Sequence, residues 1–233
     1  MFATTNTIII IIIISTLIIF LLYKFIFNKN KKILKNSILI IGPSESGKTT
    51  FFYYLIDNPN IKTIMSMQIN ELKDHQIKFL QNKHTIIDVP GTGYYKDFIM
   101  NKLNETKLLL LFINSTDKNS IVQSSEYLYD ILNSDKFNDE IYIIICCNKQ
   151  DENFPKSKKM IENELEKEID NLKNIKQKNN LDDNVQIGTL FQMKSKFNFK
   201  MFKNVEFIEC DKKNEYNLLI KRMKELLENK NIN

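Results

Sequence analysis

The sequence of 233 residues contains only three cysteines, two of which, Cys146 and Cys147, are adjacent inside an apolar run. So few cysteines in this arrangement do not form the disulfide framework that holds many small secreted domains together. We therefore expect buried, reduced thiols in a cytosolic domain. The second residue is Phe2 and not glycine, so we do not expect N-myristoylation as a means of membrane attachment.

Acidic residues are absent from the N-terminal flank, where none precedes Glu45. The flank instead carries five lysines, which are Lys24, Lys29, Lys31, Lys32 and Lys35. Without these five, the 33 basic residues equal the 28 acidic residues in number, so the formal charge of +5 belongs to the flank alone. The rest of the chain is formally neutral, and we expect no direct binding of nucleic acid.

The run from Phe2 to Tyr23 has no charged residue, and as a helix it would extend roughly 33 Å, enough to cross a bilayer. A cleaved signal peptide is the rival, but the run lacks a basic leading region and a small-residue cleavage site. The lysines that follow would keep the C-terminal side in the cytoplasm. We expect a transmembrane signal anchor over residues 1–27, a basic linker over 28–36 and one globular domain over 37–233.

Beyond the linker, short apolar runs alternate with longer amphipathic stretches, which is typical of buried parallel strands and helices in a doubly wound α/β fold. The predicted strands are Ile38–Ile41, Thr85–Val89, Leu108–Ile113, Ile141–Cys146 and Val205–Ile208. The predicted helices begin near Thr49, Phe98, Ser120, Lys156 and Glu215. The mixed polar and apolar residues from Met65 to Lys83 indicate an antiparallel pair.

The segment from Asn179 to Asn204 interrupts this alternation. It interleaves four phenylalanines with four lysines, namely Phe191, Phe197, Phe199, Phe202, Lys194, Lys196, Lys200 and Lys203. Such a pattern superficially resembles a surface on which nucleic-acid bases stack. It also fits an edge strand with one buried face, and this is the interpretation we favour.

The segment Gly42-Pro-Ser-Glu-Ser-Gly-Lys-Thr49 matches the pattern G-x-x-x-x-G-K-[ST] between a predicted strand and a predicted helix, the context that a P-loop requires. Backbone N–H groups of such a loop cradle phosphates, Lys48 would reach the β- and γ-phosphates, and the Thr49 hydroxyl would ligate Mg²⁺. The predicted phosphate-binding residues are Gly42, Ser44, Glu45, Ser46, Gly47, Lys48, Thr49 and Thr50.

The segment Asn148-Lys-Gln-Asp151 follows a predicted strand and indicates which base is bound. The Asp151 carboxylate could accept both hydrogens on the N1 and exocyclic amino edge of guanine, which adenine lacks. We therefore expect Asn148, Lys149 and Asp151 to bind guanine, and the nucleotide to be GTP.

The segment Asp88-Val-Pro-Gly91 also follows a predicted strand. Its carboxylate is suited to hold Mg²⁺, usually through water, and the Gly91 N–H to approach the γ-phosphate. We expect a switch threonine between the P-loop helix and Asp88, and choose Thr63, which would bind nucleotide and Mg²⁺ beside Thr49 and Asp88. After Gly91, where many GTPases carry a water-orienting glutamine or histidine, stands Thr92, so we predict slow hydrolysis.

With these motifs, the chain resembles the β subunits of the signal recognition particle receptor, which are Arf-like GTPases anchored in the endoplasmic reticulum membrane. The resemblance covers nearly the whole chain and includes Glu206-Phe-Ile-Glu-Cys210 before the last helix. It implies that Cys210 and the Lys212 backbone contact the guanine. Family members usually continue this element with Ser-Ala-Lys, whereas this chain has Asp211-Lys-Lys213. Thr92 replaces the histidine usual in the family.

The resemblance also implies a single-pass protein of the endoplasmic reticulum membrane with a cytoplasmic GTPase domain. Its GTP-loaded switch regions would bind the receptor α subunit, and the ribosome or the translocation channel would be further partners. Two alternatives remain. A trafficking GTPase of the Arf or Sar type attaches to membranes reversibly, which a transmembrane anchor argues against. A non-hydrolysing membrane adaptor that holds GTP as a fixed cofactor would fit Thr92.

Overall fold

The computed structural model describes residues 14–20, 23–24, 35–58, 67–179 and 195–228. The chain divides into two compact units, Met1–Leu34 and Lys35–Asn233. In the first unit, residues 14–20 and 23–24 are helical, and most of the predicted anchor lies outside the described residues. Within the part of the chain that is described, no helix combines the length and the apolar character needed to cross a membrane.

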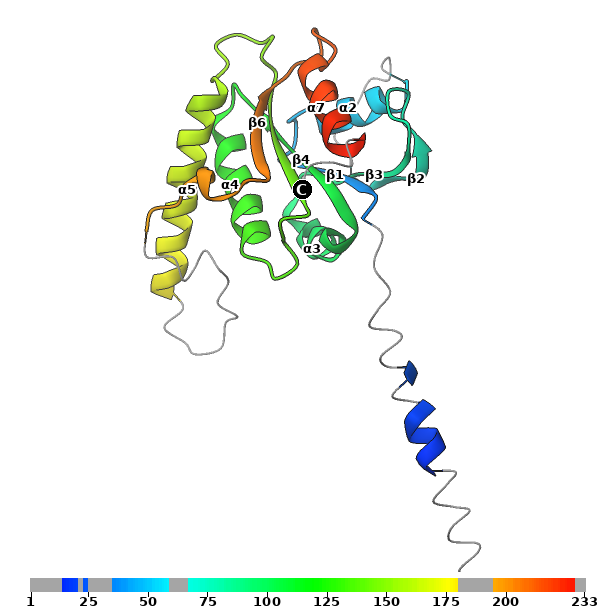
Figure 1. Ribbon diagram of the computed structural model, residues 1–233. Helices are drawn as coiled ribbons and strands as arrows, with labels where there is room; N and C mark the ends of the chain where they lie inside the picture. The colour runs from blue at the N-terminus through cyan, green and yellow to red at the C-terminus, as the bar shows by residue number, and fades with distance from the viewer. Residues whose placement is uncertain (1–13, 21–22, 25–34, 59–66, 180–194, 229–233) are drawn as a thin grey trace, which may run out of the picture. The chain divides into compact units, whose positions relative to one another are not determined.

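The second unit is built on one sheet, in which the described residues form six strands in the order β2-β3-β1-β4-β5-β6 (Figure 1). The strands are β1 (Ser37–Ile41), β2 (Asn70–Gln76), β3 (Lys83–Asp88), β4 (Thr106–Asn114), β5 (Tyr142–Asn148) and β6 (Val205–Glu209). All neighbouring pairs are parallel except β2 with β3. The predicted mostly parallel α/β sheet is therefore confirmed.

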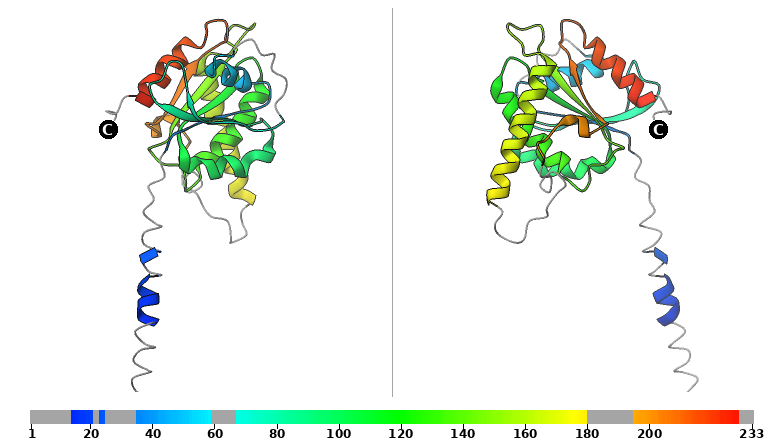
Figure 2. Two further views of the ribbon diagram at one scale, coloured as in Figure 1. Left: turned by 90° about the vertical axis from the view of Figure 1, so that its right-hand side faces the viewer. Right: turned by 60° about the vertical axis from the view of Figure 1, so that its left-hand side comes forward.

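Helices cover both faces of the sheet. They are α2 (Lys48–Leu55), α3 (Lys96–Lys102), α4 (Lys118–Leu132), α5 (Lys158–Asn179) and α7 (Asn217–Glu228). Each helix begins within two residues of the predicted start. Helices α3, α4 and α5 pack on one face and α2 and α7 on the other, which Figure 2 shows from two sides.

The central strands are buried on both faces because helices cover both, so every residue from Leu108 to Ile113 is apolar and fully buried. Successive side chains of β4 point to opposite faces of the sheet and enter two separate hydrophobic cores. Leu109 packs in the core under α4 and α5, and Leu110 in the core under α2 and α7. The three cysteines are buried and free, as the sequence predicted.

The segment between α2 and β3 differs from its prediction. In its described part, residues 67–83, there is one strand, β2, and it pairs antiparallel with β3 instead of with a second strand inside the segment. The expected antiparallel pair is thus formed by β2 and β3, whose first residue is Lys83. A register shift between Leu72 and His75 interrupts the pairing, and local alternation could not indicate this.

The expected edge strand between residues 179 and 204 is also wrong for the described residues 195–204. They contain a 3-10 turn, η3 (Phe199–Met201), whose position is fixed by hydrogen bonds to helix α5: Phe197 N–H donates to Asp170 and Phe199 N–H to Glu166. Phe197 and Phe199 are nonetheless buried, and the Phe199 ring lies 5.0 Å from that of Phe207. These rings are core residues and are not available to stack on bases.

Candidate functional site

The predicted motifs meet at the carboxyl-terminal ends of the parallel strands. The P-loop follows β1, Asp88 ends β3, Asn148 ends β5 and Cys210 follows β6. Because these strands are parallel, their carboxyl ends lie together, and this is where ligands bind in open α/β sheets. The topology therefore brings residues far apart in the sequence into one site.

The P-loop has the backbone conformation of an anion-binding nest. Gly42, Glu45 and Gly47 have positive φ angles of 137°, 61° and 96°, and left-handed residues of this kind within a turn are typical of anion-binding backbone concavities. The Ser46 hydroxyl donates to the Pro43 carbonyl at 2.8 Å, which closes the loop. Ser44 is half-buried, Glu45 is exposed, and Thr50 is half-buried in the first turn of α2.

Lys48 is a buried cation, only 5% exposed, in the first turn of α2. Its Nζ donates to the Pro43 carbonyl at 2.6 Å, and the structure shows no salt bridge of Lys48 among the described residues. Burial lowers the pKa of Lys48 to about 8, although the nearby Asp88 acts in the opposite direction. A buried ammonium surrounded by neutral oxygens is suited to meet an anionic ligand such as a phosphate.

Asp88 is fully buried at the end of β3, and its two carboxylate oxygens differ. Oδ2 accepts hydrogen bonds from Thr49 Oγ1 at 2.8 Å and Asn70 Nδ2 at 3.0 Å. Oδ1 is buried and has no hydrogen-bond partner in the part of the chain that the structure describes. Burial raises the pKa of Asp88, while the hydrogen bonds from Asn70 and Thr49 and the charge of Lys48 lower it. Thr49 and Asp88 thus fit a Mg²⁺ ion and its waters.

Gly91 lies directly against the P-loop. A Cβ at this position would lie 2.3 Å from Ser44 N, so only glycine permits the close approach. Thr92, at the position predicted to orient water, is exposed and immediately precedes the 3-10 turn η1 (Gly93–Tyr95). Thr63, the predicted switch threonine, lies outside the described residues.

Asn148 joins the base-recognition segment to the P-loop. Its Nδ2 donates to the Ser46 carbonyl at 2.8 Å, and its Oδ1 lies 3.8 Å from the Cys210 thiol. A Cβ on Gly47 would lie 2.2 Å from Asn148 Nδ2, so this contact requires glycine at Gly47. Cys210 N–H also donates to the Cys147 carbonyl, which places β6 beside this contact.

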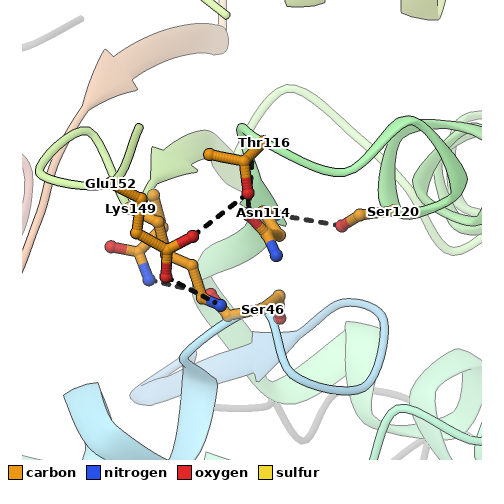
Figure 3. A network of polar contacts seen from close by, with 7 residues as sticks. Ser46, Asn114, Thr116, Ser120, Lys149 and Glu152 are labelled. Atoms are coloured by element: carbon orange, nitrogen blue, oxygen red, sulfur yellow. Dashed lines mark hydrogen bonds and ion pairs between the residues drawn. The ribbon is translucent and has the colours of Figure 1, made fainter. Parts of the chain in front are cut away.

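Lys149 and Asp151 follow Asn148 in a turn. Lys149 has a φ of 65°, and its Nζ forms a salt bridge of 3.1 Å with Glu152. Glu152 in turn accepts from Thr116 Oγ1 at 3.1 Å, and Figure 3 shows this network beside Ser46. Asp151 is exposed, so its carboxylate is accessible to a base that lies over this turn.

Sequence reasoning missed two polar residues of the site. Gln150, the variable position of the motif, donates through Nε2 to Ser115 Oγ at 2.9 Å and to the Lys156 carbonyl, which holds the turn in place. Asp211, the departure from the family pattern, is buried and accepts from Asn214 N–H at 2.7 Å, so it stabilises the turn that carries the exposed Lys212. Nothing in the local sequence indicated either contact.

The family model described as the signal recognition particle receptor beta subunit matches residues 33–206, most of the chain. The chain belongs to this family. Two relatives are the β subunits of Mus musculus, 27% identical over 198 residues, and of Dictyostelium discoideum, 28% identical over 151 residues. The mouse alignment covers 82% of this chain and 73% of the relative, and the Dictyostelium alignment covers 63% and 51%.

Solved structures of family members share the fold. The structure described as the mammalian SRP receptor matches with a TM-score of 0.66 and 25% identity, covering 82% of this chain and 99% of that one. The SRb-GTP/SRX complex from Chaetomium thermophilum matches with a TM-score of 0.58 and 17% identity, covering 75% and 93%, and at this identity shows the fold alone. The small GTPase fold is thereby established.

The burial of Lys48 predicts a gain of stability when its charge is removed. Below pH 8 Lys48 is charged in both the folded and the unfolded state, so burial of the ammonium destabilises the folded state by its full amount. This destabilisation disappears as the pH rises toward 10.5, the pKa of Lys48 in the unfolded state. Lys48→Met should therefore raise the free energy of unfolding of the nucleotide-free chain at pH 7 by about 1–3 kcal/mol, and abolish nucleotide binding.

Urea unfolding at pH 7 and pH 10, with Lys118→Met as the exposed control, measures this effect. The gain should be clearly smaller at pH 10 than at pH 7. A Lys48→Met chain that is less stable than the native chain at pH 7 would show that the ammonium is already satisfied by neutral oxygens.

Proposed function

We propose that this chain is the membrane-anchored, GTP-binding β subunit of a signal recognition particle receptor. In this role it binds GTP with Mg²⁺ and, in the GTP-bound state, binds the receptor α subunit through its switch regions. It thereby acts in the co-translational targeting of ribosomes to the endoplasmic reticulum, with the ribosome or the translocation channel as further partners.

The contact of 2.8 Å between Asn148 Nδ2 and the Ser46 carbonyl carries the nucleotide part of this proposal. It joins the segment that would recognise guanine to the loop that would bind its phosphates, so a base and its phosphates can be held by one rigid site. The buried Lys48 and the Asp88 carboxylate, whose Oδ1 has no partner among the described residues, supply the charges that a phosphate chain and its Mg²⁺ need. In this site Thr49, Asp88 and Thr63 hold the metal, and Asp151 reads the base.

The membrane part rests on the sequence. The uncharged run from Phe2 to Tyr23 and the lysines that follow it are what an anchor with a cytoplasmic C-terminal side requires. Residues 1–27 would then be a single-pass anchor in the endoplasmic reticulum membrane, residues 28–36 a linker and residues 37–233 the cytoplasmic GTPase domain.

The partner part is supported by a family member that was solved in a complex described as SRb-GTP/SRX. In this chain an exposed aromatic residue, Tyr94, follows three residues after Gly91, whose N–H is expected to approach the γ-phosphate, and Tyr94 is 88% exposed. Tyrosines of this kind are frequent at the centres of protein interfaces. We assign Tyr94 to the surface that meets the α subunit.

Co-purification with the N-terminal domain of the α subunit tests this assignment. The whole chain in detergent should retain that domain with a non-hydrolysable GTP analogue and release it with GDP. Tyr94→Ala should weaken binding at least about tenfold. Leu218→Ala, which removes an exposed apolar side chain elsewhere, on helix α7, should leave binding unchanged. Equal retention with both nucleotides would contradict the proposed GTP dependence.

Thr92 supports slow hydrolysis, and it favours the second candidate, an adaptor that keeps its GTP. A small GTPase with glutamine at this position hydrolyses GTP at only about 4 × 10⁻⁴ s⁻¹ without an activator. Because a threonine hydroxyl reaches less far than a carboxamide, the chain should purify mostly with GTP bound. Thr92→Gln and Thr92→His should leave binding intact.

Nucleotide extraction followed by chromatography measures this occupancy. If GDP predominates in the absence of an activator, another group orients the attacking water and the chain is an active switch.

A further inference from the structure

Asn70 connects the edge strand of the sheet to the carboxylate of Asp88. It is the first residue of β2 and pairs with Asp88, the last residue of β3, in the antiparallel register. The Asn70 side chain is half-buried, and its Nδ2 lies 3.0 Å from Asp88 Oδ2. This contact belongs to none of the sequence motifs, because it arises from pairing between strands and not from the spacing of residues.

The hydrogen bonds at Asp88 are unevenly shared between its oxygens. Oδ2 accepts from both Asn70 Nδ2 and Thr49 Oγ1, whereas Oδ1 is buried and has no partner among the described residues. The two donors, one on strand β2 and one on helix α2, converge on one oxygen and fix the rotation of the carboxylate. They also leave the lone pairs of Oδ1 unused, which in a buried carboxylate is costly unless a ligand completes the arrangement.

A water molecule of a Mg²⁺ shell is a suitable donor for Oδ1. Thr49, whose hydroxyl hydrogen goes to Asp88 Oδ2, keeps the lone pairs of its oxygen for direct ligation of the metal. Asn70 donates its N–H to Oδ2, so this hydrogen bond leaves the lone pairs of Oδ1 available to a water of the metal. The Asn70 contact therefore orients the carboxylate and leaves the metal position accessible.

We propose that Asn70 is a positioning residue for Mg²⁺ binding. By donating to Asp88 Oδ2, it orients the carboxylate so that Oδ1 accepts a hydrogen bond from a water of the metal. The inference rests on the proposed binding of GTP and Mg²⁺. It assigns to the edge strand β2 a direct role in the strength of metal binding. Partners that hold a metal ligand in orientation typically contribute a factor of 10 to 100 to metal affinity.

The release rate of a fluorescent GDP analogue from the whole chain, measured from chelator to saturating Mg²⁺, tests this role. Asn70→Ala should raise the Mg²⁺ concentration for half-maximal slowing about tenfold. In chelator, where the carboxylate has no metal to position, Asn70→Ala and the native chain should release GDP at the same rate. Lys73→Ala, an exposed change three residues further along β2, should match the native chain throughout.

The outcomes separate this inference from the proposed function. If the native chain releases GDP at a rate that Mg²⁺ does not change, the proposed Mg²⁺ site fails and Asn70 fails with it. If Mg²⁺ slows release from the native chain and Asn70→Ala gives the same titration, only the role of Asn70 is overturned. An equal acceleration by Asn70→Ala with and without Mg²⁺ would also overturn it, because such a change reflects damage to the nucleotide site as a whole.

Discussion

The hydrogen bond from Asn148 to the Ser46 carbonyl joins two segments that are 102 residues apart in the sequence. It is possible only because β1 and β5 run parallel on either side of β4, so that the loops after them meet at the same edge. Gly47 has no Cβ where Asn148 approaches. If the two segments separated, the site for phosphates and the site for a base would no longer have a fixed spacing, and one nucleotide could not satisfy both.

The carboxyl-terminal ends of the strands also carry buried charged groups that lack a salt bridge or a hydrogen bond in the described part of the protein. Among the residues that the structure describes, buried Lys48 has no salt bridge and one buried oxygen of Asp88 has no hydrogen bond. Each arrangement costs stability in the protein without ligand. A nucleotide with its metal ion would meet both needs at once, so part of its binding free energy would come from relieving this cost. Strained or unsatisfied groups of this kind are typical of functional sites.

Much of the fold could be predicted from the sequence because buried parallel strands appear as continuous apolar runs and the helices begin at clear changes of pattern. The P-loop and Asn148 could be placed because each follows such a run. The contact of Asn70 with Asp88 could not be predicted, since it depends on the register of an antiparallel pair interrupted between Leu72 and His75. The alternating rings around Phe197 fit both a strand and a turn that packs on a helix, and only tertiary contacts to α5 decide between them. The roles given to Asp151, Thr92 and Thr63 remain predictions.

The central claim is that this site binds guanine nucleotides through the carboxylate of Asp151. Asp151→Asn exchanges an acceptor for an amide that can donate to the second carbonyl of xanthine. The most direct test is the ratio of the dissociation constants for GTP and XTP, measured for the native chain and for this variant. We predict that the native chain prefers GTP and that the variant prefers XTP, because the variant lacks an acceptor for one hydrogen of the guanine edge. An unchanged affinity for GTP in the variant would contradict the claim.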